Sequence, residues 1–285
     1  MTSHLGNPGS SLPAQGLENS RRYTPPSIHA VEHSSSTPWI DVHSRWADRG
    51  RDIRADMVRI GLAMLQGARH EHAEALLNAS EELGIEIEII ELRKSSQIDS
   101  SIAALVLPGG ESTAMRKASQ SESLLEGIFN WMNDYPLRPV LGTCAGAILL
   151  ANPNEKLEPF VNAEISRNAW GRQRQSFQAP LEVNLETPSG KNTIEIELQR
   201  DNFNHKPLKM SHEAAKSDSD SFPGVFIRAP RFITKSVKCT PVVMLGEEVV
   251  GILDDSKLAL TFHPELTLDR RFHRWLIVHA KDNFC

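Results

Sequence analysis

The sequence predicts an α/β protein in which a mostly parallel sheet is covered by helices. From Met57 onward, short aliphatic and β-branched runs alternate with helix-forming segments. Strands that alternate with helices are joined by right-handed crossovers, which make the strands parallel and place helices on the faces of the sheet. The later part of the chain has short strand-like runs separated by turns, which indicates that the sheet also has antiparallel members.

The first half of this pattern begins with residues 58–65, a run of aliphatic and β-branched side chains that predicts a buried strand. Residues 72–83 place alanines and leucines near one helical face, and Gly84 is a suitable helix stop. The same reasoning predicts further strands at 85–92, 102–107 and 139–141, and helices at 121–131 and 145–151.

The second half reads as short strands with a final helix. Gly246-Glu247-Glu248 lies between two strand-like runs and predicts a hairpin. A last helix is expected from about Asp269, with Phe272, Trp275 and Leu276 as apolar members. The predicted strands of this half are 181–185, 193–198, 225–229, 242–245, 249–253 and 258–262.

Two segments differ from this pattern. Residues 1–56 are rich in Ser, Pro, Gly, Asn and His and show no strand or helix period, so we expect a disordered extension. Met57 directly precedes the first strand, so it is an alternative start of the chain, and a regulatory tail is the other interpretation. Residues 199–221 are polar and predict an exposed insertion. The folded domain is therefore expected over residues 57–285.

Composition excludes several classes of function. A net charge of −5 without a basic run gives no electrostatic basis for binding nucleic acid or an anionic membrane. No apolar stretch approaches the ~20 residues of a membrane-spanning helix. The three cysteines, Cys144, Cys239 and Cys285, are too few and odd in number for a disulfide framework. We therefore expect a cytoplasmic protein.

Gly142-Thr143-Cys144-Ala145-Gly146 has the strand, turn and helix context of a nucleophile elbow, with Cys in the place of Ser. A side chain at either glycine would crowd the tight turn that presents the Cys144 sulfur. A helix N-terminus and a nearby imidazole would both favour the thiolate. Taken alone, Cys144 could equally be a buried structural cysteine.

His263-Pro264-Glu265 supplies a base and a group to orient it. The segment follows a predicted strand, and because alternate strand residues point the same way, we expect His263 and Glu265 to share a face. Cys, His and Glu then form a triad in which His263 activates Cys144. Most histidines in an enzyme are not catalytic, so the prediction depends on the combination with Cys144.

Pro108-Gly109-Gly110-Glu111-Ser112-Thr113 follows the predicted strand 102–107 and opens a helix. Two glycines allow the backbone to approach a ligand and to point an N–H at a developing oxyanion. The alternative is an ordinary glycine-rich turn. Its position at the carboxyl end of a strand, where α/β sheets bind ligands, favours the functional interpretation.

These three segments occur together with three others in one known pattern. The chain from Val58 onward resembles the class I glutamine amidotransferases, and more narrowly the glutaminase subunit of the two-protein pyridoxal 5′-phosphate synthase (the PdxT/SNO family). Around Gln66, Arg167 and Arg228 the resemblance is specific to this narrower family. The matching segments are Leu-Gln-Gly-Ala at 65–68 with Glu-His at 71–72, 107–113 with Met-Arg at 115–116, 142–146, Arg-Asn at 167–168 with 171–173 and 176–177, 225–230, and 262–267.

The resemblance implies a flavodoxin-like three-layer sandwich with a mixed, mostly parallel central sheet, and hydrolysis of L-glutamine without a cofactor or metal. It implies that Cys144 attacks the side-chain amide of glutamine, with His263 as base and acid and Glu265 orienting His263. The backbone N–H groups of Gly110 and Ala145 would form the oxyanion hole. The implied glutamine contacts are Gly110, Glu111, Ser112, Arg167, Ile227 and Arg228.

The charges of free glutamine agree with these contacts. Its ammonium calls for an acidic partner such as Glu111, and its carboxylate for a guanidinium such as that of Arg167 or Arg228. Either arginine alone would be read as a surface residue. In the family, Gln66 lies where a PdxS/SNZ-like synthase subunit docks, which implies ammonia transfer to that subunit within a large hetero-oligomer.

The chain departs from the family pattern in the extension before Met57, in the insertion at 199–221 and at 152–163, which lacks the usual Gly-Leu-Leu. Two other interpretations stay open. Another amidase or peptidase with Cys, His and Glu would not need Gln66 or the two arginine segments, and a non-catalytic regulatory homologue would not need a reactive Cys144.

Overall fold

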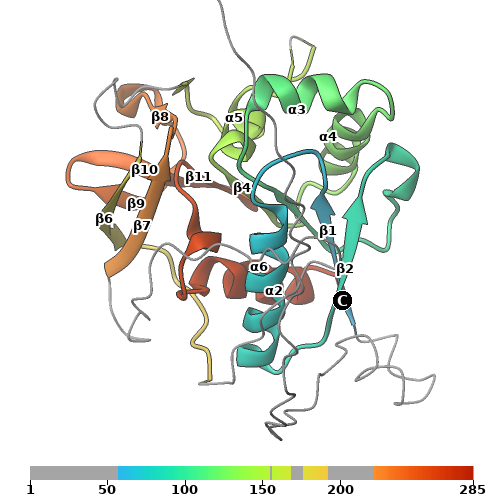
Figure 1. Cartoon of the computed structure of the whole chain (residues 1–285), viewed down its shortest axis with the longest axis horizontal. Coiled ribbons are helices and arrows are strands. Elements are labelled where there is room, and N and C mark those ends of the chain that lie inside the picture. Colours follow the sequence, from blue (N-terminus) through green and yellow to red (C-terminus); the bar gives the residue numbers. More distant parts are fainter. Residues whose placement is uncertain (1–56, 155, 168–175, 192–220, 285) are drawn as a thin grey trace, which may run out of the picture. The chain divides into compact units, whose positions relative to one another are not determined.

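A nine-stranded mixed sheet organises the described chain, which comprises residues 57–154, 156–167, 176–191 and 221–284 of a computed structural model (Figure 1). The strand order is β2-β1-β3-β4-β11-β10-β9-β6-β7. Neighbours from β2 to β11 run parallel. Neighbours from β11 to β7 run antiparallel. The predicted α/β class with a mixed sheet is confirmed, and the half of the sheet from β2 to β11 is entirely parallel.

The strands of this sheet and of a small second sheet are β1 Val58–Ala63, β2 Ile87–Leu92, β3 Ala104–Leu107, β4 Val140–Thr143, β5 Ile165–Ser166, β6 Ser176–Val183, β7 Ser221–Ile227, β8 Arg231–Phe232, β9 Thr240–Leu245, β10 Glu248–Asp254 and β11 Lys257–Leu260. β5 and β8 pair with each other outside the main sheet. The α-helices are α2 Arg69–Leu83, α3 Ser112–Ser119, α4 Leu124–Asp134, α5 Ala145–Ala151 and α6 Arg271–Asp282. Single 3₁₀ turns are η2 Ser95–Gln97, η3 Thr234–Ser236 and η4 Pro264–Leu266.

Helices cover both faces of the parallel half, which gives three layers. α2 and α6 lie on one face, and α3, α4 and α5 on the other (Figure 1). Two hydrophobic clusters fill the two interlayer spaces. In β3, Ala104 and Val106 belong to the first cluster, while Leu105 and Leu107 belong to the second. This alternation explains why β3 is apolar at every position, as a strand buried on both faces must be.

Most predicted elements lie within a few residues of their observed bounds. The helix after the cysteine, α5, matches its prediction, and Gly84 ends α2 in the left-handed conformation with φ 65°. Gly246, with φ 58°, turns the chain between antiparallel β9 and β10, as the hairpin prediction required. The predicted strand 193–198, the extension 1–56 and the predicted insertion, apart from Ser221, lie outside the described residues. Ser221 itself begins β7.

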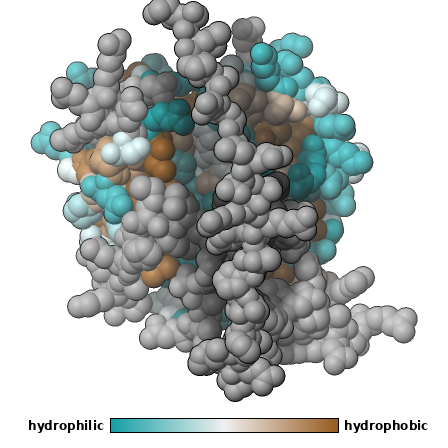
Figure 2. Space-filling model, viewed as in Figure 1, coloured by the Kyte–Doolittle hydropathy of each residue, from teal (hydrophilic) through white to brown (hydrophobic). Residues whose placement is uncertain are grey.

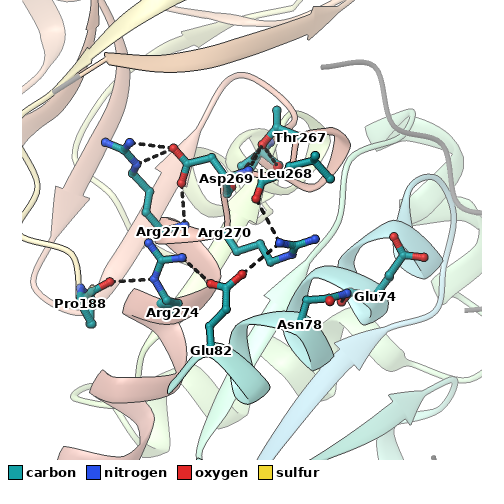
Figure 3. Close-up of polar contacts among 11 residues, drawn as sticks. Glu74, Asn78, Glu82, Pro188, Thr267, Leu268, Asp269, Arg270, Arg271 and Arg274 are labelled. Carbon is teal, nitrogen blue, oxygen red and sulfur yellow. Dashed lines mark hydrogen bonds and ion pairs between the residues drawn. The ribbon is translucent and has the colours of Figure 1, made fainter. Parts of the chain in front are cut away.

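A buried cluster of ion pairs joins α2 to the start of α6 (Figure 3). The two carboxylate oxygens of Glu82 accept hydrogen bonds from Arg270 and Arg274. Arg274 also donates to the carbonyl oxygen of Pro188 at 2.7 Å. Beside them, Asp269 pairs with Arg271 at 2.7 Å. The cluster therefore fixes α6 directly after the loop that carries His263 and Glu265.

On the face drawn in Figure 2, hydrophilic residues predominate over the edge formed by α3 and α4. Large hydrophobic side chains that are exposed among the described residues are Leu137, Ile233 and Phe284. Within the described part of the chain, no helix is both long and apolar enough to cross a membrane.

Candidate active site

Gln66, the predicted catalytic residues and the predicted oxyanion donors follow the ends of four parallel strands. β1, β3, β4 and β11 are neighbours in the order β1-β3-β4-β11. Their carboxyl ends lead into the segments that carry Gln66, Gly109, Cys144 and His263, respectively. Because the carboxyl ends of parallel strands meet at one edge, segments up to about two hundred positions apart in the sequence become neighbours. This edge is also where open α/β sheets bind their ligands.

Cys144 occupies the sharp turn between β4 and α5. Its backbone has φ 49° and ψ −102°, a conformation that residues other than glycine rarely adopt. Such a conformation costs ~1–3 kcal/mol and persists only where surrounding contacts impose it. One of these contacts is the hydrogen bond from the Cys144 N–H to the carbonyl oxygen of Leu260, at 2.8 Å. The turn is that of a nucleophile elbow, as the spacing of the glycines predicted.

Two glycines make the close packing around Cys144 possible. A Cβ on Gly146 would lie 2.0 Å from the carbonyl oxygen of Leu107. A Cβ on Gly109 would lie 2.4 Å from Cε1 of His263 and 3.3 Å from Cβ of Cys144. Gly109 therefore lies directly against both members of the predicted nucleophile–base pair.

His263 and Glu265 form a buried pair. Nδ1 of His263 lies 2.7 Å from Oε1 of Glu265, and Glu265 is fully buried. Although burial works against the charged imidazole, the negative charge of Glu265 and a hydrogen bond with Cys144 raise the pKa of His263 to about 10. Burial opposes ionisation of Glu265, but its electrostatic interactions with His72 and His263 hold its pKa below the usual value. The pair thus favours a protonated imidazole beside Cys144.

The reason predicted for this pairing was wrong, although the residues do meet. Strand alternation was expected to place His263 and Glu265 on one face. β11 in fact ends at Leu260, and Pro264–Leu266 form the 3₁₀ turn η4. A hydrogen bond from the His263 N–H to the carbonyl oxygen of Val225 in β7, at 2.8 Å, holds the start of this turn.

Sequence reasoning missed two buried histidines, His72 and His273, that lie behind Glu265. Nε2 of His72 lies 3.0 Å from Oγ1 of Thr143 and 3.4 Å from Oε2 of Glu265. Nδ1 of His72 lies 3.0 Å from Nε2 of His273 in α6. His72 was part of a matched motif but had no assigned role, and no motif pointed to His273. A buried position on an otherwise apolar helical face was the only available signal.

The loop between β3 and α3 carries the predicted oxyanion donor Gly110, whose φ of 150° favours glycine. The side chain of Gln66 contacts this loop, because its Oε1 accepts a hydrogen bond of 3.3 Å from the backbone N–H of Glu111. Ala145, the second predicted donor, is the first residue of α5, so its N–H has no acceptor within that helix. Gln66 is thus placed to affect the conformation of Gly110.

Glu111 and Arg167 lie near each other at the start of α3. The Glu111 carboxylate caps the helix by accepting hydrogen bonds from the N–H groups of Thr113 at 2.9 Å and Ala114 at 2.7 Å. These bonds, aided by the charge of Arg167, lower the pKa of Glu111. Arg167 donates to Oγ1 of Thr113 at 3.1 Å, and Ser112 is buried beneath the loop. The predicted acidic and basic substrate contacts are therefore neighbours.

The other predicted arginine follows β7. Ile227 is the last residue of this strand, and Arg228 next to it is exposed with φ 43°. β7 reaches the site because its Val225 accepts the hydrogen bond from His263. A left-handed conformation is costly for arginine, and such strain is common at functional sites, so the binding role remains a prediction.

The arrangement provides a nucleophile, a base and a carboxylate that orients the base, which together suit acyl transfer. Among the residues that the structure describes, no group of three His, Cys, Asp or Glu side chains is placed to hold a metal ion.

Comparison with known proteins gives the family. The chain matches the SNO glutamine amidotransferase family over residues 62–191 and 185–282. It is 37% identical to the pyridoxal 5′-phosphate synthase subunit PdxT of Thermococcus gammatolerans over 231 residues, which cover 79% of this chain and 100% of that protein. The protein of the same name from Pyrococcus furiosus is 35% identical, with 78% and 98% covered. A crystal structure described as a glutamine amidotransferase superposes with a TM-score of 0.56 at 33% identity, covering 78% of this chain and 98% of the other. The chain belongs to the SNO glutamine amidotransferase family.

Proposed function

We propose that this chain is the glutaminase subunit of a pyridoxal 5′-phosphate synthase: it hydrolyses L-glutamine to L-glutamate and ammonia, and the ammonia passes to a synthase subunit. The observation that carries the proposal is the contact of His263 with both Cys144 and Glu265 at the ends of adjacent strands. Family membership supports glutamine as the substrate, and the name of the relatives supports the pathway.

The reaction follows from these groups. The Cys144 sulfur attacks the side-chain amide carbon of glutamine, and the carbonyl oxygen becomes an oxyanion held by the N–H groups of Gly110 and Ala145. His263 donates its proton to the leaving nitrogen, so ammonia departs and a thioester remains. His263 then removes a proton from water, which attacks the thioester and releases glutamate. Glu265 keeps the imidazole oriented throughout and stabilises its positive charge whenever His263 is protonated.

Glutamine is recognised by its charged end. Its ammonium faces Glu111, and its carboxylate faces Arg167 or Arg228, where a guanidinium can donate two hydrogen bonds. Gly110, Ser112 and Ile227 line the same region. The Glu111 carboxylate is already held by the N–H groups of α3, so it offers a fixed charge rather than a mobile one.

The partner is a PdxS/SNZ-like synthase subunit in a large hetero-oligomer. Gln66 is the residue that couples the two proteins, since its side chain contacts the loop that presents Gly110. Docking near Gln66 can therefore change the oxyanion hole, so that glutamine is hydrolysed faster when the synthase subunit is bound. A cytoplasmic location fits this proposal, because a thiolate nucleophile needs a reducing compartment.

The test is co-expression with a synthase subunit and an assay of glutamate release from glutamine, with the Cys144→Ala variant as control. We expect release by the wild type, with rates that rise when the synthase subunit is added, and none by the variant. Full activity in Cys144→Ala would refute the mechanism. Cleavage of peptides without a partner, and no action on glutamine, would indicate an amidase or peptidase instead.

A further inference from the structure

We propose that His72, held in turn by His273, is a positioning residue that fixes the triad carboxylate Glu265 from the side opposite His263. The inference rests on the proposed function, since it assigns a role within the same site. It concerns two histidines that belong neither to the triad nor to the predicted substrate contacts.

The first argument is the division of the two oxygens of Glu265. Oε1 lies 2.7 Å from His263, whereas Oε2 lies 3.4 Å from Nε2 of His72. A carboxylate that is contacted at both oxygens cannot rotate about its last bond without losing one contact. His72 therefore sets the plane of the carboxylate, and through it the direction of the acceptor that His263 meets.

The second argument is burial. Glu265, His72 and His273 each have 0% of their surface exposed, so water does not surround this carboxylate. A buried carboxylate is costly unless donors or positive charges face it. Two imidazoles do so here: those of His72 from α2 and His263 from the loop after β11 both stabilise the ionised form.

The third argument is the order of hydrogen bonds along the chain of histidines. If Nε2 of His72 carries the proton, it can donate to Oγ1 of Thr143 at 3.0 Å, and Oε2 of Glu265 lies 3.4 Å from the same nitrogen. Nδ1 of His72 then accepts from the Nε2–H of His273 at 3.0 Å. In this tautomer, donor and acceptor are matched both between His72 and Thr143 and between His273 and His72. With His273 as the donor to Nδ1, the N–H of His72 lies on the side that faces Glu265.

The structure of the two helices explains why this arrangement holds. His72 lies in the first turn of α2, directly after the Gln66 loop, and His273 lies in the first turn of α6, shortly after Glu265. The two helices lie on the same face of the sheet, where the ion pairs of Glu82 join them (Figures 1 and 3). The imidazole pair is therefore held from both sides.

Two substitutions that differ in reach test the inference. In His72→Gln, the terminal amide can place an N–H near the position of Nε2 and so still reach Glu265. In His72→Asn, the shorter amide reaches only the position of Nδ1, beside His273. His279, on the same helix as His273, bonds the carbonyl oxygen of Trp275 and serves for the control variant His279→Asn.

Two readouts are measured for each variant, with the synthase subunit present: kcat and KM for glutamine, and the rate at which iodoacetamide alkylates Cys144, followed by peptide mass spectrometry. We expect His72→Asn to lower kcat by roughly 10–100-fold, the usual effect of losing a group that orients a catalytic side chain, with KM nearly unchanged. Alkylation of Cys144 should slow in parallel. His72→Gln and His279→Asn should stay near wild type.

A His72→Asn variant with wild-type kcat and alkylation rate would overturn the inference. Equal losses of kcat in His72→Asn and His72→Gln would also overturn it, because they would indicate that His72 contributes packing alone. If His72→Asn does not fold, His273→Leu is compared with His279→Leu. A selective fall in kcat for His273→Leu supports the inference, and equal rates overturn it.

These outcomes separate the inference from the proposed function. A wild type that does not hydrolyse glutamine, but whose Cys144 alkylation depends on His72, removes the proposed function and keeps the inference. If the wild type hydrolyses glutamine and all variants have the same kcat and alkylation rate, the proposed function stands and the inference is overturned.

Discussion

Replacing Gly109 by alanine tests whether the backbone around the nucleophile is as tightly packed as the structure indicates. The added Cβ would lie 2.4 Å from Cε1 and 3.0 Å from Nδ1 of His263. Gly109 does not have a positive φ, so alanine brings no backbone strain and the effect is purely one of space.

The magnitude follows from this overlap. Carbon atoms in contact are ~3.5–4.0 Å apart, so the imidazole or the loop must move by about 1 Å. A displacement of this size in a catalytic group can lower the rate ~100-fold, which corresponds to about 2.7 kcal/mol of transition-state stabilisation. Overpacking should also reduce the free energy of unfolding by ~1–3 kcal/mol.

The assay is glutamate release by the complex with the synthase subunit, together with urea unfolding of the chain alone. Gly61→Ala is the matched control, because its Cβ would be similarly crowded, 2.6 Å from Cδ2 of Leu105, but in the middle of β1. We expect the control to lose stability and keep its kcat. If Gly109→Ala keeps more than about half of the wild-type kcat, the inference that the added Cβ displaces His263 or the loop is refuted.

Three further predictions follow from the charges and backbone of the site. Glu265→Gln removes the principal group that raises the pKa of His263. The alkaline limb of the pH profile of kcat/KM should therefore move to lower pH, and kcat should fall by roughly 10²–10⁴-fold. An alkaline limb that does not move would contradict the role of Glu265 as the partner of His263. Because the folded pKa of His263, about 10, lies above its usual value of 6.5, the stability that this pair contributes is fully present below pH 6.5 and is lost as pH rises through 10. Arg228→Gly relieves the left-handed strain at φ 43°, which stabilises the folded state by ~1–2 kcal/mol, and frees the unfolded chain, which costs ~0.4–1 kcal/mol. Thermal unfolding should therefore show no loss of stability, while KM for glutamine rises roughly 10–100-fold. An unchanged KM would exclude Arg228 from binding. Glu82→Ala removes the buried carboxylate shared by two guanidiniums of α6 and should lower the free energy of unfolding by ~3–5 kcal/mol in urea, whereas a loss below ~1 kcal/mol would show that the cluster contributes little.

Local patterns predicted the parallel half of the fold and the candidate residues Cys144, His263 and Glu265. Each strand, and each segment that carries one of these residues, is a short contiguous stretch of sequence. The strand, turn and helix around Cys144 depend on neighbouring residues, and the glycines there are explained by contacts with adjacent strands. The partnership of His72 with His273 could not be predicted in this way. It depends on how α2 and α6 pack, and the two histidines are 201 positions apart. For the same reason, the antiparallel order β10-β9-β6-β7 followed no local signal beyond the one hairpin.

The order of the strands also explains why the catalytic rate and the affinity for glutamine can be changed separately. Cys144 keeps its strained conformation because the strands on either side of β4 hold it: Leu260 of β11 accepts its N–H, and Leu107 of β3 packs on Gly146. The same two strands lead directly into His263 and Gly109, so the reacting groups are fixed by the sheet itself. Arg167 and Arg228 follow short or terminal strands outside the parallel half. Substitutions at these two arginines should therefore alter KM, whereas changes at the ends of β3, β4 and β11 should alter kcat.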